Sequence, residues 1–188
     1  QYGATQGYGP FLESLASFLS DQKAYLPDVD AHNLFLTAGA SQALDLAATM
    51  YADSGDTVVV EEPTYFVIEK IFQEHSLNIV GIPTDGDGLN TKALQELLEN
   101  GLSLKFLYTI PTFQNPTGSS LSEQRRIHLI ELANRYNFQI FADEVYQLIY
   151  FDQNPPRPMM YFDSGNRVIS FGSFSKILAP GLRTGWIH

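Results

Sequence analysis

The stretch SFGSFSKILAPGLRTGW, residues 170–186, places one lysine among small and hydroxyl-bearing residues. Lys176 follows Ser173 and Ser175, and Arg183 comes seven positions after the lysine. Serine hydroxyls and an arginine fork can hold a phosphate. A lysine whose pKa is lowered by burial and nearby positive charge can form a Schiff base. The pattern therefore predicts a phosphate site beside a nucleophilic lysine, in preference to a surface lysine in a serine loop.

Two further polar residues follow apolar runs. Asp143, in ADEVYQLIYF at 142–151, comes directly after such a run, and Tyr146 lies three residues later. A carboxylate at a buried strand end is unfavourable unless it is paired. The partner could be a pyridinium nitrogen, a salt bridge or a helix N-terminus, and the pattern favours the first. Asn115, in PTFQNPTG at 111–118, lies in a turn, where its amide could donate to a ligand oxygen or stabilise the turn itself.

Two motifs are weaker when each is taken alone. Tyr65, in EEPTYF, can stack on a planar ligand, but the motif by itself favours an ordinary rim or core tyrosine. Glu61 and Glu62 of the same motif are interpreted as a charge pair at a strand end. Gly39, in TAGASQALDL, precedes a predicted helix whose free N–H groups suit a phosphate, but the motif taken alone favours an ordinary helix start, because Gly-rich helix starts are common.

The elements that must position these residues alternate along the chain. Helices are predicted at 10–19, 41–51, 64–74, 91–98 and 122–136, with Thr91 and Ser122 as capping residues. Strands are predicted at 57–60, 79–82, 104–110, 138–142 and 168–171, as continuous apolar runs typical of strands buried on both faces. The alternation predicts an α/β fold, three layers with a mostly parallel sheet. Asn115, Asp143 and Lys176 each follow a strand, so they are expected at one site.

Composition narrows the function classes. The net charge of −10 over 188 residues argues against a nucleic-acid partner. The absence of cysteine excludes disulfides and thiolate metal sites and fits a cytoplasmic protein. The four histidines have no metal-ligand spacing, so no metal is expected, and no apolar run has membrane-spanning length. The chain lacks an initial Met and stops after GWIH, which predicts a segment of a longer protein.

Taken as an ordered set, the motifs resemble the class I and II aminotransferases of fold type I, which use pyridoxal 5′-phosphate (PLP). The spelling of QNPTG and GSFSKILAPGLR is most similar to the subgroup of 2-aminoadipate and kynurenine aminotransferases. The resemblance runs from Tyr2 to Trp186. It implies that residues 1–188 are an incomplete PLP-binding large domain, without the N-terminal segment and the C-terminal small domain of the family.

The resemblance also implies roles for individual residues. Lys176 would carry PLP as a Schiff base and shuttle a proton. Asp143 would pair with the pyridine nitrogen, Tyr146 and Asn115 would contact the phenolic oxygen, and Tyr65 would stack on the ring. The phosphate would be held by the helix start at Gly39, Ala40 and Ser41 and by Ser173, Ser175 and Arg183. Tyr2 would reach the phosphate of a neighbouring subunit, which implies a homodimer with shared active sites.

The implied activity is transfer of an amino group from an amino acid to a 2-oxo acid. Two alternatives stay open. One is a PLP lyase of the same fold, and the other is the PLP-binding effector domain of a GntR/MocR-type transcription regulator. The family's small domain supplies an arginine for the substrate carboxylate, so whether this segment alone is active is also left open.

Overall fold

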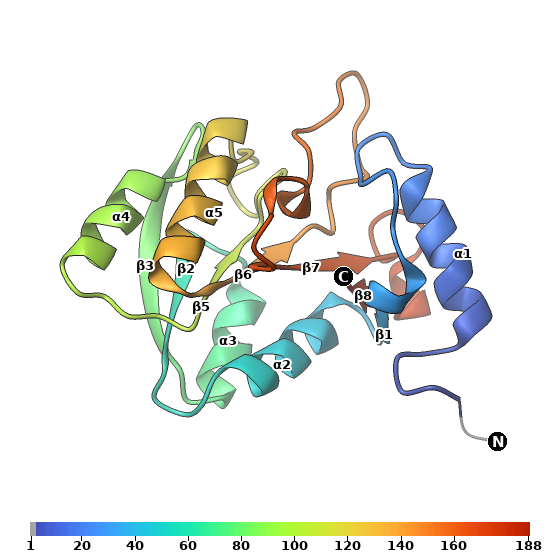
Figure 1. Cartoon of the computed structure of the whole chain (residues 1–188), viewed down its shortest axis with the longest axis horizontal. Coiled ribbons are helices and arrows are strands. Elements are labelled where there is room, and N and C mark those ends of the chain that lie inside the picture. Colours follow the sequence, from blue (N-terminus) through green and yellow to red (C-terminus); the bar gives the residue numbers. More distant parts are fainter. Residues whose placement is uncertain (1–2) are drawn as a thin grey trace.

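The structure, a computed structural model, describes residues 3–188. Helices and strands alternate along much of the chain (Figure 1). The α-helices are α1 (Gly9–Ser20), α2 (Ala40–Tyr51), α3 (Phe66–Glu74), α4 (Thr91–Glu99) and α5 (Glu123–Tyr136). The strands are β1 (Phe35–Thr37), β2 (Thr57–Glu62), β3 (Asn78–Asp85), β4 (Gly88–Leu89), β5 (Phe106–Thr109), β6 (Gln139–Asp143), β7 (Val168–Ser173) and β8 (Gly185–Ile187). Short 3₁₀ turns lie at Ala31–Asn33, Met159–Phe162 and Pro180–Leu182.

The strands form one sheet in the order β1-β8-β7-β6-β5-β2-β3-β4. The strands from β7 through β6, β5 and β2 to β3 pair in parallel. Strand β8 is antiparallel to both β1 and β7, and β4 is antiparallel to β3. The predicted α/β class with a mostly parallel sheet is therefore confirmed. The parallel strands bring the carboxyl ends of β2, β5, β6 and β7 to one edge of the sheet.

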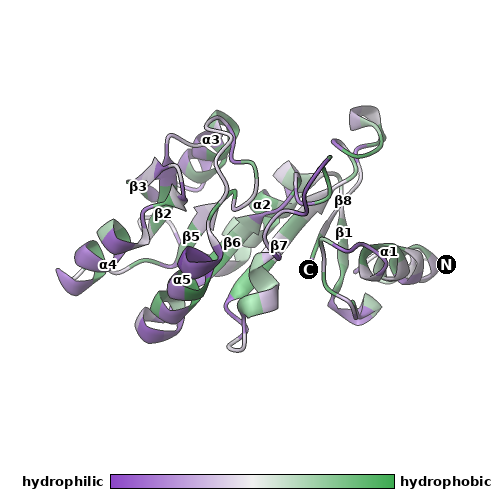
Figure 2. Ribbon diagram, turned by 90° about the horizontal axis from the view of Figure 1, so that it is seen from above, coloured by the Kyte–Doolittle hydropathy of each residue, from purple (hydrophilic) through white to green (hydrophobic). Residues whose placement is uncertain are grey.

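Helices cover both faces of this sheet. Successive residues of a strand point to opposite faces, so the apolar strands present hydrophobic side chains to the helices on each side. Val59 and Ile140 belong to a buried cluster that includes residues of α4 and α5. Val60 and Phe141 belong to a second cluster, which includes residues of α2 and α3. Figure 2 shows the hydrophobic strands between helices whose outer faces are more hydrophilic. The sheet thus lies between a layer that contains α4 and α5 and a layer that contains α2 and α3, which gives the predicted three layers.

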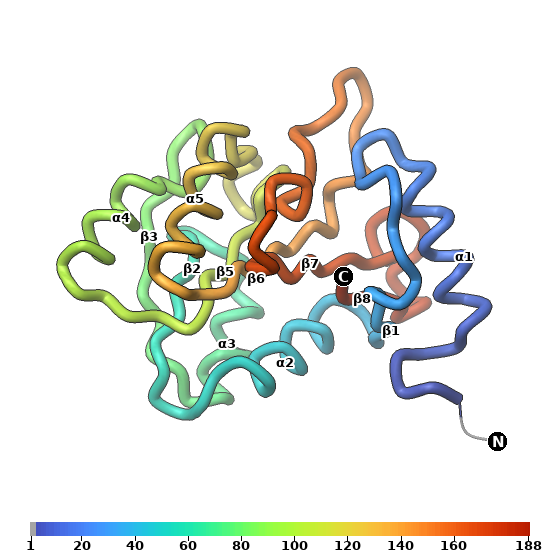
Figure 3. Tube along the Cα trace, viewed as in Figure 1, coloured from blue at the N-terminus to red at the C-terminus, as the bar shows by residue number. Residues whose placement is uncertain are grey.

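Helix α1 covers the end of the sheet that contains β1 and β8. Its buried Leu12, Leu15 and Leu19 recur at helical spacing and cluster with Trp186 of β8. The segment after α1, blue in Figure 3, runs beside the segment after β6, orange in the same view. Gln147 joins the two, because its Nε2 donates to the Ala24 carbonyl at 2.8 Å. No helix within residues 3–188 has the length and apolar character needed to cross a membrane.

Some local predictions were wrong. The side chain that caps α4 is Asn90, which accepts from the N–H groups of Lys92 and Ala93, and not Thr91. Ser122 does occupy the cap position of α5, but its side chain makes no capping hydrogen bond. Strands β1, β4 and β8 were not predicted, since runs of two or three residues carry no periodic signal.

Candidate active site

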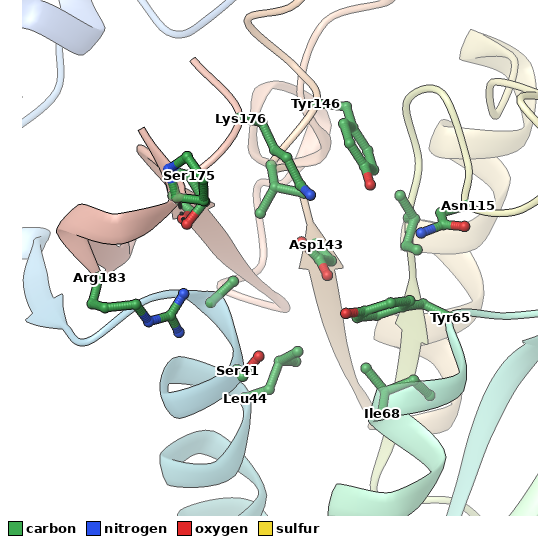
Figure 4. Close-up of a pocket in the computed structure, with 15 residues that line it drawn as sticks. Ser41, Leu44, Tyr65, Ile68, Asn115, Asp143, Tyr146, Ser175, Lys176 and Arg183 are labelled. Carbon is green, nitrogen blue, oxygen red and sulfur yellow. Dashed lines mark hydrogen bonds between the residues drawn. The ribbon is translucent and has the colours of Figure 1, made fainter. Parts of the chain in front are cut away.

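A pocket with a cavity of about 200 Å³ lies at the carboxyl edge of the parallel strands (Figure 4). Most of the site residues predicted from the sequence line it, and these are Ala40, Ser41, Tyr65, Asn115, Asp143, Tyr146, Ser173, Ser175, Lys176 and Arg183. Gly39 lies directly before this lining, and Tyr2 lies outside the described residues. The apolar lining was not predicted, and it consists of Leu44, Ile68, Ile110, Val145 and Pro180. Helical spacing could have found Leu44 and Ile68, which follow Ser41 and Tyr65 by three residues.

Asp143 ends β6 and is almost fully buried. Tyr108 Oη donates to Asp143 Oδ2 at 2.7 Å, whereas Asp143 Oδ1 is buried without a hydrogen-bond partner in the described residues. Burial raises the pKa of this carboxyl to about 6, against the opposing effects of the Tyr108 hydrogen bond, the Val145 N–H and the Lys176 charge. The Val145 N–H lowers the pKa of the Asp143 carboxyl, although it does not form a regular hydrogen bond with Asp143 Oδ1. No ion pair within residues 3–188 satisfies this carboxylate.

Lys176 lies on the connection between β7 and β8, and its Nζ is 6.0 Å from the centre of the Tyr146 ring. In Figure 4 the amine points into the pocket, above Asp143. The two serines before it are held as a pair, because Ser173 Oγ and Ser175 Oγ lie 3.0 Å apart and Ser175 N–H donates to Ser173 Oγ at 3.1 Å. The end of β7 and the connection after it therefore place an amine and two hydroxyls in the pocket.

The part of the pocket next to these serines suits an anion, because Arg183 and the start of α2 lie on the same side as Ser175 (Figure 4). Helix α2 begins after Gly39, whose φ is 96°, and no side chain caps its first turn. Its first N–H groups are thus available at the positive end of the helix dipole. The guanidinium of Arg183 lies against Gly39, because a Cβ built on that glycine would meet Arg183 Nη2 at 2.9 Å. Arg183 Nη2 also donates to the Ala38 carbonyl at 3.1 Å.

Tyr65 and Asn115 enter the pocket from the other side (Figure 4). Tyr65 is the residue before α3, and Asn115 lies in the turn after β5. The interpretation of Glu61 and Glu62 as a charge pair was wrong, because strand alternation sends their side chains to opposite faces. Glu61 is buried and accepts hydrogen bonds from β5 and from the turn that follows it, whereas Glu62 is exposed.

Together these groups fit a planar, phosphorylated ligand with a ring nitrogen. Arg183, the serines and the start of α2 offer a place for the phosphate, and Tyr65 offers a face for the ring. The unpartnered Asp143 Oδ1 needs an N–H donor in the pocket, since an orphaned buried oxygen is unfavourable. Among residues 3–188, no group of three or more His, Asp or Glu side chains is arranged to hold a metal ion.

Comparison with known proteins gives one family over the whole chain and relatives of two kinds. The family described as "Aminotransferase class I and II" matches residues 1–188. Aromatic-amino-acid aminotransferase 1 of Thermococcus litoralis is 41% identical over 100% of this chain and 45% of its own length. An uncharacterized HTH-type transcriptional regulator of Bacillus subtilis, YdfD, is 33% identical over 99% of this chain and 38% of its own length.

Solved structures give the same picture. The crystal structure of Pyrococcus horikoshii kynurenine aminotransferase, in complex with PMP, superposes with a TM-score of 0.90 at 38% identity. That match covers 100% of this chain and 46% of the other. The chain thus spans less than half the length of the proteins that it is similar to.

Proposed function

Because the chain belongs to the aminotransferase class I and II family, we propose that its full-length protein transfers an amino group from an amino acid to a 2-oxo acid with PLP as cofactor. The single observation that carries this proposal is the buried Asp143 Oδ1, which lacks a partner in the same pocket as the Lys176 amine. An N–H on the ring of PLP is the donor that this oxygen lacks. Bound PLP would supply an aldehyde that condenses with amines and a ring that withdraws electrons.

The chain's own residues then have distinct tasks. Lys176 Nζ would hold the cofactor aldehyde and, once released, move the proton of the substrate's α-carbon. Asp143 Oδ1 would accept the ring N–H and keep the ring protonated. Tyr146 and Asn115 would donate to the phenolic oxygen, and Tyr65 would cover one face of the ring.

The phosphate group would be bound at the wall opposite Tyr65. The contributing groups are the backbone N–H groups of Ala40 and Ser41, the hydroxyls of Ser173 and Ser175, and the Arg183 guanidinium. Residues 1–188 would thus be part of the PLP-binding large domain, while the rest of the protein would bind the substrate carboxylate. Tyr2 would contribute to the site of a second copy in a cytoplasmic homodimer, in line with the family resemblance.

The second candidate function is that of a PLP-binding effector domain in a transcription regulator. The observation that favours it is the similarity to the HTH-type regulator of Bacillus subtilis over nearly the whole chain. Both functions would use the same pocket. They differ in whether an amino acid converts the bound PLP. Single-turnover conversion of bound PLP by amino acids in the full-length protein would identify the enzyme, whereas binding without conversion would identify the regulator.

Reductive labelling tests the cofactor site. The protein is mixed with PLP and reduced with borohydride, and the modified peptide is mapped by mass spectrometry. We expect a pyridoxyl group on Lys176 that is lost in Lys176→Ala and kept in the matched control Lys105→Ala, since the Lys105 side chain is half exposed and interacts with Asp56. Labels spread over surface lysines in a folded protein would contradict the proposal.

A further inference from the structure

Two buried polar side chains, Glu61 and Gln114, lie behind the candidate site without lining it. Glu61 is 1% exposed and Gln114 is 2% exposed. Burying a carboxylate and an amide is unfavourable unless their hydrogen bonds are satisfied. Their contacts therefore show which parts of the chain they hold.

Glu61 binds the ends of two neighbouring strands together. Its Oε1 accepts from Thr109 Oγ1 at 2.7 Å, and its Oε2 accepts from the Ile110 N–H at 3.0 Å. Its Oε2 also accepts from Gln114 Nε2 at 3.2 Å. The carboxylate oxygens of Glu61 accept all three hydrogen bonds. The Gln114 amide is therefore oriented with its NH₂ group, and not its oxygen, towards Glu61.

Gln114 in turn joins the segments that carry Tyr65 and Asn115. Its Nε2 donates to the carbonyl of Pro63, two residues before Tyr65, at 2.8 Å. Its Oε1 accepts from Thr117 N at 2.9 Å and from Thr117 Oγ1 at 2.7 Å, which closes the turn that contains Asn115. One amide group thus bridges two segments that are about fifty residues apart in sequence.

Glu61 and the ligand pocket belong to opposite faces of the sheet. Glu61 is two residues after Val59 on β2, so both side chains point to the same face of the sheet. Val59 packs there in the cluster that includes residues of α4 and α5. Asp143 is two residues after Phe141 on β6 and points to the other face, where Phe141 packs in the cluster that includes residues of α2 and α3. Glu61 therefore does not line the ligand pocket, and it acts on the pocket through the residues that it holds and through its charge, which interacts with that of Asp143.

We propose that Glu61 and Gln114 are positioning residues that fix the Tyr65 ring and the Asn115 amide relative to each other across the pocket. This inference rests on the proposed function, because the spacing matters for a flat ligand that both residues contact. Loss of the bridge would free both segments together, since Gln114 is the side chain that contacts both.

The test uses the full-length protein without cofactor and measures hydrogen exchange by mass spectrometry. In Gln114→Leu we expect faster exchange in both 63–67 and 111–119. Glu61→Gln should keep the protection of wild type, because its amide oxygen can accept from Ile110 and Gln114 while its NH₂ donates to Thr109 Oγ1. Thr91→Val is the control, since the buried Thr91 makes a different, partly buried hydrogen bond to His128, between α4 and α5, which the change removes.

Faster exchange in 111–119 alone, with 63–67 as in wild type, would overturn the inference. So would equal loss of protection in Thr91→Val. If Gln114→Leu does not fold by circular dichroism, Gln114→Asn is assessed by the same criteria, because the shorter side chain cannot span both contacts.

PLP titration is the second readout. We expect Gln114→Leu to bind PLP about tenfold more weakly, with a shifted visible absorption band, while Thr91→Val binds as wild type. Unchanged PLP affinity in a variant whose two segments exchange faster would overturn the link to the ligand. If wild type itself fails to bind PLP, the proposed function fails, and the exchange experiment still decides whether the bridge exists.

Discussion

Tyr108 Oη donates to Asp143 Oδ2 at 2.7 Å across the parallel pair β5–β6, and the second oxygen of that carboxylate has no partner in the described residues. Tyr108 is opposite Phe141 in the register, so its ring reaches two residues further along β6 to meet the carboxylate. One oxygen is thus held by the sheet, and the other is left for a ligand.

Replacing Tyr108 with Phe should destabilise the protein and raise the pKa of Asp143. The change removes the hydrogen bond that lowers this pKa and leaves both buried oxygens unpartnered. We expect the free energy of unfolding at pH 7 to fall by about 1–3 kcal/mol. Urea denaturation measures this loss, and PLP titration should show weaker binding. Wild-type stability in Tyr108→Phe would mean that the hydrogen bond has no energetic role.

The contribution of Glu61 to stability should decline as the pH rises from about 4.5 to about 7, whereas that of the buried His188, whose pKa is lowered from 6.5 to about 4, should increase over the lower part of this range. Burial raises the pKa of Glu61 from 4.5 to about 7, so the folded state binds a proton more tightly than the unfolded chain. This contribution is complete below the unfolded pKa and is lost as the pH passes the folded pKa, with an upper magnitude of about 3 kcal/mol.

Urea denaturation of the cofactor-free protein at pH 5 and pH 8 checks this dependence. Asp143 titrates in the same direction, because its pKa is raised from 3.8 to about 6. Glu61→Gln should therefore keep only the part of the pH dependence that Asp143 and other groups supply. An identical dependence in wild type and Glu61→Gln would show that Glu61 does not titrate as expected.

Gly39→Ala should weaken the phosphate contact specifically. The added Cβ would meet Arg183 Nη2 at 2.9 Å and would sit on a residue with φ of 96°. Displacing the guanidinium should reduce the preference for PLP over pyridoxal by about tenfold, a comparison that isolates the phosphate. Gly55→Ala is the matched control, because it has a similar φ of 89° but open space around the new Cβ. Equal effects in the two variants would point to backbone strain alone.

Gly172→Ala should disturb the packing of β8 against β7. A Cβ at this residue would lie 2.0 Å from Trp186 Cε2, so the indole must move. We expect a loss of stability of about 1–3 kcal/mol. Trp186 is the chain's single tryptophan, so its fluorescence should shift to the red as the ring becomes exposed. Gly181→Ala, which meets no atom within 4 Å, should leave the spectrum unchanged.

The sequence predicted the parts of the molecule that depend on local pattern. The long helices and central strands follow from periodicity and apolar runs, and parallel pairing places Asn115, Asp143 and Lys176 at one edge. The pairing of Phe35 with Ile187 was not predictable, because short strands are specified by distant partners. Tyr108 and Glu61 were missed for a related reason. Each looks like an ordinary strand residue until the neighbouring strand shows what it contacts.

The pairing of β1 with β8 also bears on how the molecule is made. Gly39, close after β1, and Arg183, close before β8, meet only when segments about 145 residues apart in sequence have come together. Contacts of such sequence separation are slow to form, because the loop between them must close first. During synthesis, the growing polypeptide cannot complete the anion-binding wall until Arg183 has left the ribosome. The ligand would therefore be captured only after strands β1 to β7 have been synthesised.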